Sequence, residues 1–168
     1  MRRAIGVMAL CSALLVAGSA HAAQAMQHYQ NPALHYAVTY PTSWSRIGVP
    51  GADFAAVSAN RNAFVSVAAT SGKANAVQVQ RALAGAFTEF GHPLGGPSYR
   101  PFRIQGATGT LAQDRVAAPN GKTSLVLAFM LSRHGLIYFA LGVVRDANPR
   151  TSMDVAAALA FVSDTAIV

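Results

Sequence analysis

Two long apolar runs, residues 125–131 and 136–144, dominate the hydrophobic pattern of the chain, and the polar residues 132–135 separate them. Continuous apolar runs bounded by turn formers are typical of strands that are covered on both faces. Asn120 and Gly121 precede the first run and favour a tight turn, because this pair adopts positive φ angles at low cost. The pattern therefore predicts an antiparallel hairpin in the middle of a sheet.

Shorter segments with alternating or β-branched residues predict further strands. They cover residues 35–40, 54–58, 63–70, 99–105 and 107–113. Pro41 ends the first segment, because proline restricts the residue before it and cannot donate to a sheet. Turn-forming residues connect 54–58 to 63–70, so we expect these two segments to pair as a hairpin.

One amphipathic helix is predicted between residues 76 and 90. Its apolar residues recur at spacings of three and four, as on one helical face: Ala76, Val79, Leu83, Phe87 and Phe90. Gly91 and the following Pro93 end this pattern. A second helix is expected near the C-terminus, where Pro149 or Thr151 begins an alanine-rich segment that extends to Val162.

Hairpin connections rather than helical crossovers predict an α+β fold, in which helices flank an antiparallel β-sheet. The buried central strands favour a three-layer α/β/α sandwich with one helix on each face of the sheet. A two-layer domain that dimerises through its bare face would give the same strand pattern.

The first 22 residues follow a different pattern. Arg2 and Arg3 precede an apolar run, and small residues follow it up to Ala22, as in a cleavable secretory signal. The run is short for a membrane-spanning helix, so we expect no transmembrane segment after cleavage. We predict a signal peptide at 1–22, a flexible mature N-terminus at 23–34 and a single domain at 35–168, located in the periplasm or outside the cell.

The chain is basic, with 13 Lys and Arg against 6 Asp and Glu and a formal net charge of +7. A basic surface favours anionic partners, such as phospholipid headgroups, envelope polymers or an acidic protein face. Nucleic acid is not an expected partner, because the sequence has no basic run and no recognition-helix pattern. The candidate partner-binding residues are Arg46, Arg61, Arg100 and Arg103, which could equally be dispersed solubility charges.

No local motif for catalysis is visible. The acidic residues lie at least eight positions apart, and the histidines show no metal-ligand repeat. We therefore predict no catalytic residue, no cofactor and no metal, with one conditional exception. Cleavage after Ala25 would leave His28 as the third residue, and its imidazole, the new amine and two amide nitrogens would suit Cu(II) or Ni(II).

The segment Tyr40, Pro41, Thr42, Ser43, Trp44 follows the first predicted strand of the domain. It resembles the Y-P-x-x-W segment of the PsbP-like family, which includes the photosystem II extrinsic protein PsbP and bacterial DcrB-like envelope proteins. We expect structural roles for Tyr40, Pro41 and Trp44, since Pro41 fixes the backbone where the strand ends and Trp44 can fold back to seal one end of the core. The resemblance implies an antiparallel sheet between helices and an accessory or binding role without catalysis.

Three functional hypotheses follow. The first is an exported, non-enzymatic accessory or binding protein that recognises an envelope protein or an anionic envelope component. The second is a small-ligand carrier with an apolar pocket between helix 76–90 and the sheet. The third is an envelope enzyme whose residues come together only in the folded protein. The sequence does not indicate the partner or the oligomeric state.

Overall fold

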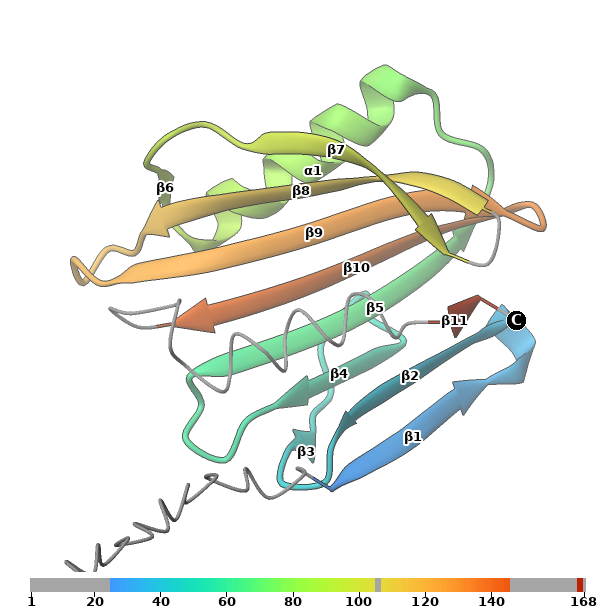
Figure 1. Ribbon diagram of the computed structural model, residues 1–168, viewed down its shortest axis with the longest axis horizontal. Helices are drawn as coiled ribbons and strands as arrows, with labels where there is room; N and C mark the ends of the chain where they lie inside the picture. Colours follow the sequence, from blue (N-terminus) through green and yellow to red (C-terminus); the bar gives the residue numbers. More distant parts are fainter. Residues whose placement is uncertain (1–24, 105–106, 146–165, 168) are drawn as a thin grey trace, which may run out of the picture.

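A twisted antiparallel sheet of eight strands forms the centre of the molecule (Figure 1). The computed structural model describes residues 25–104, 107–145 and 166–167. The strands are β3 (Ser45–Arg46), β4 (Phe54–Val57), β5 (Ala63–Ser71), β6 (His92–Pro93), β7 (Ser98–Ile104), β8 (Ala107–Ala117), β9 (Thr123–Arg133) and β10 (Leu136–Arg145). Their order is β3–β4–β5–β10–β9–β8–β6, and β7 also pairs with β8. The predicted antiparallel pairing is confirmed throughout this sheet.

The predicted central hairpin is formed by β9 and β10, whose register runs from Leu136 opposite Arg133 to Arg145 opposite Ser124. Successive side chains of a strand point to opposite faces of the sheet. Leu127 and Phe129 therefore enter one core cluster, while Val126 and Ala128 enter another on the opposite face. Both sets are fully buried, which confirms that the hairpin is covered on both sides.

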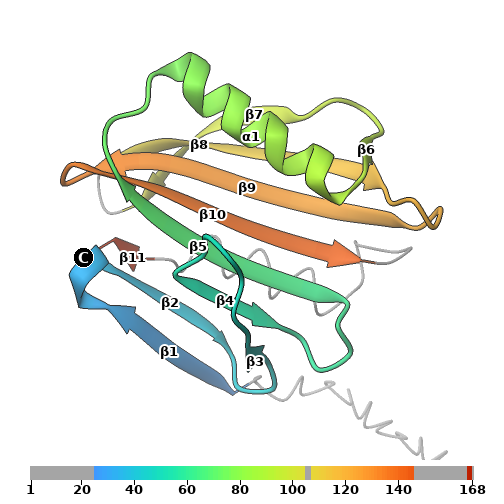
Figure 2. The same ribbon diagram turned by 180° about the vertical axis from the view of Figure 1, so that it is seen from behind.

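The predicted helix is α1 (Ala76–Phe90), which lies across one face of the sheet over β8 and β9 (Figure 2). Asn75 begins the helix with a capping box: Gln78 N donates to Asn75 Oδ1 at 2.9 Å, and Asn75 N donates to Gln78 Oε1 at 3.0 Å. Leu83 and Phe87 are the buried anchors of its apolar face. Gly91 follows the helix at φ +149°, where any Cβ would overlap the Ala117 carbonyl.

A second, three-stranded sheet covers part of the opposite face. It consists of β1 (Met26–Asn31), β2 (Tyr36–Pro41) and β11 (Ala166–Ile167), in the order β1–β2–β11. The buried residues Tyr36, Val38 and Tyr40 of β2 belong to the same core cluster as Phe129 of the large sheet. The edge-to-face contact between the rings of Tyr36 and Tyr138, with centroids 6.5 Å apart, joins the two sheets.

The three-layer α/β/α sandwich is therefore wrong for the described residues, where α1 is the one α-helix and strands pack on the other face of the sheet. The apolar runs showed that both faces of the central strands are covered, but they carried no information on whether a helix or a strand covers them. The second predicted helix, at 149–162, lies outside the described residues.

The expected flexible segment 23–34 also differs from the structure. From residue 26 onward it forms β1 and the short 3-10 helix η1 (Pro32–Leu34), and β1 pairs with β2 along its whole length. The exposed residues of β1 alternate with half-buried ones, because an edge strand exposes one of its two faces. The predicted signal peptide lies outside the described residues.

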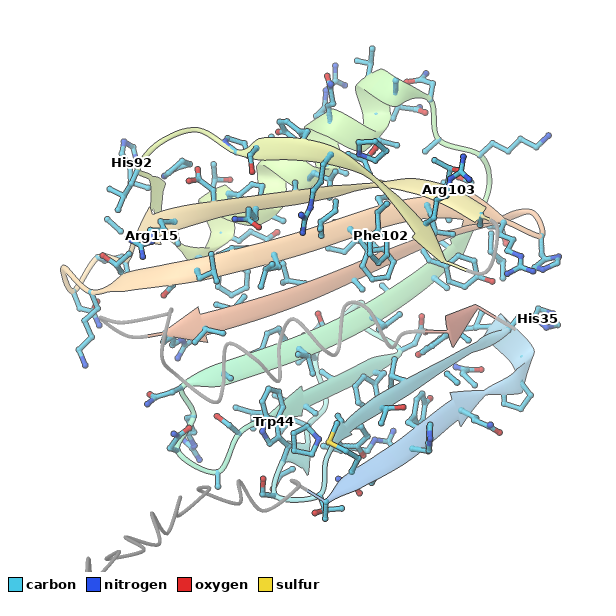
Figure 3. The ribbon with its side chains drawn as sticks, viewed as in Figure 1. His35, Trp44, His92, Phe102, Arg103 and Arg115 are labelled. Carbon is cyan, nitrogen blue, oxygen red and sulfur yellow. The ribbon has the colours of Figure 1, made fainter. Side chains whose placement is uncertain are left out.

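The segment at residues 40–44 forms the corner between β2 and β3. Trp44 is buried, and its backbone nitrogen donates to Pro41 O at 3.0 Å. The side-chain amide of Gln27 donates to the same carbonyl at 3.3 Å, and the Tyr40 ring meets the Phe54 ring edge-on at 5.0 Å. This corner connects the small sheet to the large one (Figure 3).

Candidate functional site

A cavity of about 470 Å³ opens beside the C-terminal end of α1. Its volume lies within the range of small-molecule sites, about 300–1,000 Å³. Five apolar residues and two arginines line it: Ile47, Val49, Val57, Phe64, Phe90, Arg61 and Arg145. The described part of the lining contains no acidic side chain. The cavity therefore combines hydrocarbon walls with a positive charge.

The position of α1 explains why this cavity exists. The helix packs on β8 and β9, and the face of the sheet that it covers continues over β10, β5 and β4. Phe64 of β5 lies opposite Val143 of β10, a residue of the core cluster under the helix, so Phe64 points to the helical face. Figure 2 shows the end of α1, the end of β10 and the start of β5 at the same edge of the molecule.

A rigid turn between β4 and β5 positions Arg61. The buried Ser58 hydroxyl donates to Asn60 Oδ1 at 2.7 Å and accepts from Ala63 N at 2.9 Å. Asn62 N donates to the same Asn60 oxygen at 3.0 Å, and Arg61 N donates to Ser58 O at 2.8 Å. These bonds fix the backbone on both sides of Arg61, while its side chain is exposed at the cavity.

Arg61 has a φ of +58°, in the left-handed region. A residue with a Cβ pays about 1–2 kcal/mol for this conformation, and glycine or asparagine adopts it at lower cost. Strained backbone is tolerated where the surrounding structure determines it, and it is concentrated at functional sites. His35 and His134 share this conformation outside the lining of the cavity, so the strain by itself assigns no role to Arg61.

Arg145 is the last residue of β10, and its backbone nitrogen donates to Asn62 O at 2.6 Å. This bond ties the end of β10 to the β4–β5 turn. The two arginines are far apart in sequence, yet the backbone contact places both at one cavity.

A second cavity of about 220 Å³ shares Phe90 and Arg145 with the first. The β8–β9 turn forms its other side, where Gly121 N donates to Ala118 O at 2.9 Å and Lys122 N to Asn120 Oδ1 at 3.1 Å. Its described lining also contains Glu89, Pro119 and Ser124. We call these two neighbouring cavities the arginine groove, with the first as its apolar part and the second as its polar part.

The other candidate arginines lie outside the residues that line this groove. The Arg46 guanidinium carbon lies 4.5 Å from the centroid of the Tyr29 ring, a cation–π contact between β3 and β1. Arg100 and Arg103 of β7 are an odd number of positions apart, so they point to opposite faces of the sheet. Figure 3 places Arg103 at the opposite end of the sheet from the end of β10.

Of the four predicted arginines, the structure thus brings only Arg61 to the arginine groove. The sequence analysis did not select Arg145, because this residue directly follows an apolar run that is accounted for by a buried strand. Phe64 and Phe90 were expected on a strand and a helix, but their meeting at one cavity depends on the tertiary structure. The Asn-rich linker around Arg61 was the one local signal, because it predicts a tight, defined turn.

Among the described residues, no three His, Cys, Asp or Glu side chains lie close enough to hold a metal ion. His28 belongs to β1, and its Nδ1 lies 3.1 Å from Thr39 Oγ1. The conditional copper or nickel site would use backbone nitrogens of this strand, and it stays a prediction. The described helices include none that is long and apolar enough to cross a membrane.

Two buried tyrosines have perturbed acidity, and both lie away from the arginine groove. Burial raises the pKa of the Tyr36 hydroxyl, and the nearby Tyr29 and Asp53 raise it further. Burial also raises the pKa of the Tyr138 hydroxyl, although the Arg133 charge opposes this effect. Both side chains therefore stay neutral at physiological pH and act as packing residues between the two sheets.

The comparison with solved structures identifies the fold. The chain matches the solution structure of cyanobacterial PsbP (CyanoP) from Synechocystis sp. PCC 6803 with a TM-score of 0.62 at 14% identity, over 92% of this chain and 99% of that one. It matches LpqN, involved in cell envelope biogenesis of Mycobacterium tuberculosis, with a TM-score of 0.54 at 15% identity, over 85% and 91% of the two chains.

A crystal structure from Bacteroides thetaiotaomicron matches with a TM-score of 0.57 at 9% identity, over 84% of this chain and 48% of that one. Neither a family model nor a curated protein matches the sequence. At these identities the likeness establishes the fold. The resemblance carried by residues 40–44 is confirmed, and the chain has the PsbP-like fold.

Proposed function

We propose that this chain is an exported, non-enzymatic accessory protein that binds a small component of the cell envelope in the arginine groove. The cavity beside α1 is the observation that carries the proposal, because it has the volume of a small-molecule site and a rigid rim. Export is supported by the signal-peptide pattern of the first 22 residues. The PsbP-like fold is compatible with an accessory role.

The chemistry of the lining favours binding over catalysis. The cavity beside α1 presents hydrocarbon side chains and two guanidinium groups. Guanidinium stays protonated in proteins and donates hydrogen bonds, so it holds anions but does not exchange protons at neutral pH. The dispersed positions of Arg46, Arg100 and Arg103 favour this groove over one broad basic surface as the binding site.

Native mass spectrometry of the protein purified from its own cell envelope tests the proposal. We expect a reproducible bound mass on the wild-type chain that is lost in Val57→Trp, because the larger ring fills the cavity. Ile47→Trp is a second variant, and its exposed position makes it easier for the fold to tolerate. Val77→Trp is the matched control, since Val77 is exposed on α1 and is not part of the lining.

The proposal predicts that Val77→Trp retains the bound mass. Equal retention by all variants would place the ligand elsewhere. A chain that carries no mass, and that binds no member of a panel of envelope lipids in titration, would refute the proposed function.

A further inference from the structure

We infer that the ligand of the arginine groove is a single-chain amphipathic anion: one alkyl chain with an oxyanion head, a carboxylate or a phosphate. This inference rests on the proposed function and adds the chemical class of the ligand. The alkyl chain lies against Phe64 and Phe90, and the head is held by Arg61 and Arg145.

The apolar part of the groove is suited to a chain rather than to a polar ligand. Its five hydrocarbon side chains come from β4, β5, α1 and the segment after β3, so they surround the cavity from several sides. Ile47 lines the cavity and is 41% exposed, so its side chain offers apolar surface that a bound chain can remove from water. A bound alkyl chain would cover Ile47 and the half-buried rings of Phe64 and Phe90.

The volume distinguishes one chain from two. A methylene group takes up about as much space as a water molecule in the liquid, about 30 Å³, so a chain of about 12 carbons needs about 360 Å³. This fits the cavity of about 470 Å³. Two such chains need about 720 Å³ and exceed it. The apolar cavity therefore holds one chain of this length and leaves the second chain of a diacyl lipid outside it.

The charge of the groove sets the sign of the head. Among the described residues that line the two cavities, three cations, Arg61, Arg145 and Lys122, face one carboxylate, Glu89. The C-terminal end of α1 contributes about half a negative charge. About one and a half positive charges remain, and a guanidinium pair binds carboxylate and phosphate oxygens with two parallel hydrogen bonds each.

The second cavity gives the head additional space. It begins at Arg145, the residue that it shares with the apolar cavity, and it presents the Lys122 ammonium, the Asn120 amide and the Ser124 hydroxyl. These donors lie where a head bound to Arg145 would project. The order of the groove, with hydrocarbon first, the arginines next and polar donors last, matches the order of groups in an amphipathic anion.

The test is a calorimetric titration of the mature chain with amphiphiles of equal chain length, each kept below its micelle-forming concentration. The probes are dodecanoate, dodecyl phosphate, dodecyl maltoside and dodecyltrimethylammonium. We expect the two anions to bind, the neutral maltoside to bind at least tenfold more weakly, and the cation not to bind. A preference between the two anions then distinguishes a fatty acid from a single-chain phospholipid as the source of the head.

Chain length gives an independent readout. Each methylene buried should increase affinity about fourfold, up to the length at which the cavity is full. We therefore expect the affinity of alkyl carboxylates to rise steeply from eight to twelve carbons and to level off soon after. An affinity that does not depend on chain length would overturn the inference, because the alkyl chain would then lie outside the cavity.

Arginine variants test the head site. Arg61→Asn removes the charge with a residue that tolerates the left-handed backbone, and Arg145→Gln removes the other charge. Each should weaken dodecanoate binding about tenfold, whereas the matched control Arg103→Gln should leave it unchanged.

The outcomes separate this inference from the proposed function. If the neutral or cationic amphiphile binds as well as the anions, and Val57→Trp abolishes this binding, the groove is a ligand site but its ligand is not an anion. If Arg103→Gln weakens binding as much as Arg61→Asn, the anions bind to general surface charge and the inference fails. If no amphiphile binds, the inference fails, and the bound mass in native mass spectrometry decides the proposed function independently.

Discussion

Replacing Arg61 by glycine should stabilise the fold and weaken ligand binding at the same time. The left-handed conformation of Arg61, at φ +58°, costs about 1–2 kcal/mol for a residue with a Cβ. Glycine removes that cost but loses about 0.5–1 kcal/mol through its more flexible unfolded chain. The turn itself is held by the Ser58 and Asn60 bonds, which Arg61→Gly leaves intact.

The net gain in the free energy of unfolding is therefore about 0.5–1 kcal/mol. For a domain of this size, this corresponds to a rise in Tm of about 1–4 °C. Binding of an anionic amphiphile should fall about tenfold, because one of the two guanidinium groups at the groove is lost. Stability and binding would then move in opposite directions, which is the pattern expected where strain is retained for function.

Differential scanning calorimetry and the dodecanoate titration measure the two effects on the same protein. His134→Gly is the matched control, because His134 also has a left-handed backbone, at φ +52°, and lies in the β9–β10 turn outside the arginine groove. It should stabilise the fold by a similar amount and leave binding unchanged. A loss of more than about 1 kcal/mol in Arg61→Gly would refute the reasoning, because the arginine side chain would then support the fold itself.

Three further predictions test the elements that position the groove. Gly91→Ala should destabilise the fold by about 2 kcal/mol in urea unfolding, because the new Cβ would overlap the Ala117 carbonyl. Gly85→Ala is the control: a Cβ at Gly85 meets open space, so this change should stabilise α1 by up to about 1 kcal/mol. Ser58→Ala should lower the free energy of unfolding by about 1–3 kcal/mol, since the hydroxyl is buried and bonded to Asn60 and Ala63. A decrease below about 0.5 kcal/mol in urea unfolding would show that water replaces the hydroxyl. Alkaline pH should destabilise the wild-type protein, because burial raises the pKa of Tyr36 and Tyr138 above the unfolded value of 10.0. The stabilising contribution of the two neutral hydroxyls is therefore full below pH 10 and is lost as the pH rises above it. Tyr36→Phe should reduce this alkaline sensitivity in a pH series of urea unfolding, and Tyr99→Phe, at an exposed position, should not.

The local elements of the fold could be predicted from the sequence because each had its own periodic signal. The bounds of α1 agree with the predicted 76–90, since Asn75 caps the start of the helix through its bonds with Gln78 and Gly91 follows its end. The β9–β10 hairpin follows equally from its apolar runs and its turn. The layer on the second face was predicted wrongly, because burial of Leu127 and Phe129 required a cover but did not identify it as β2.

The arginine groove could be predicted only in part, and the reason lies in how Arg61 and Arg145 come together. A sequence pattern reports contacts between residues a few positions apart, whereas the bond between Arg145 N and Asn62 O joins the end of one strand to the turn before another. Such a contact depends on the β5–β10 register, which is set by the apolar residues along both strands. A slip of one residue in that register would point Phe64 away from the helical face and move Arg145 away from Asn62. The core residues of β5 and β10 therefore determine the site, although none of them carries its charge.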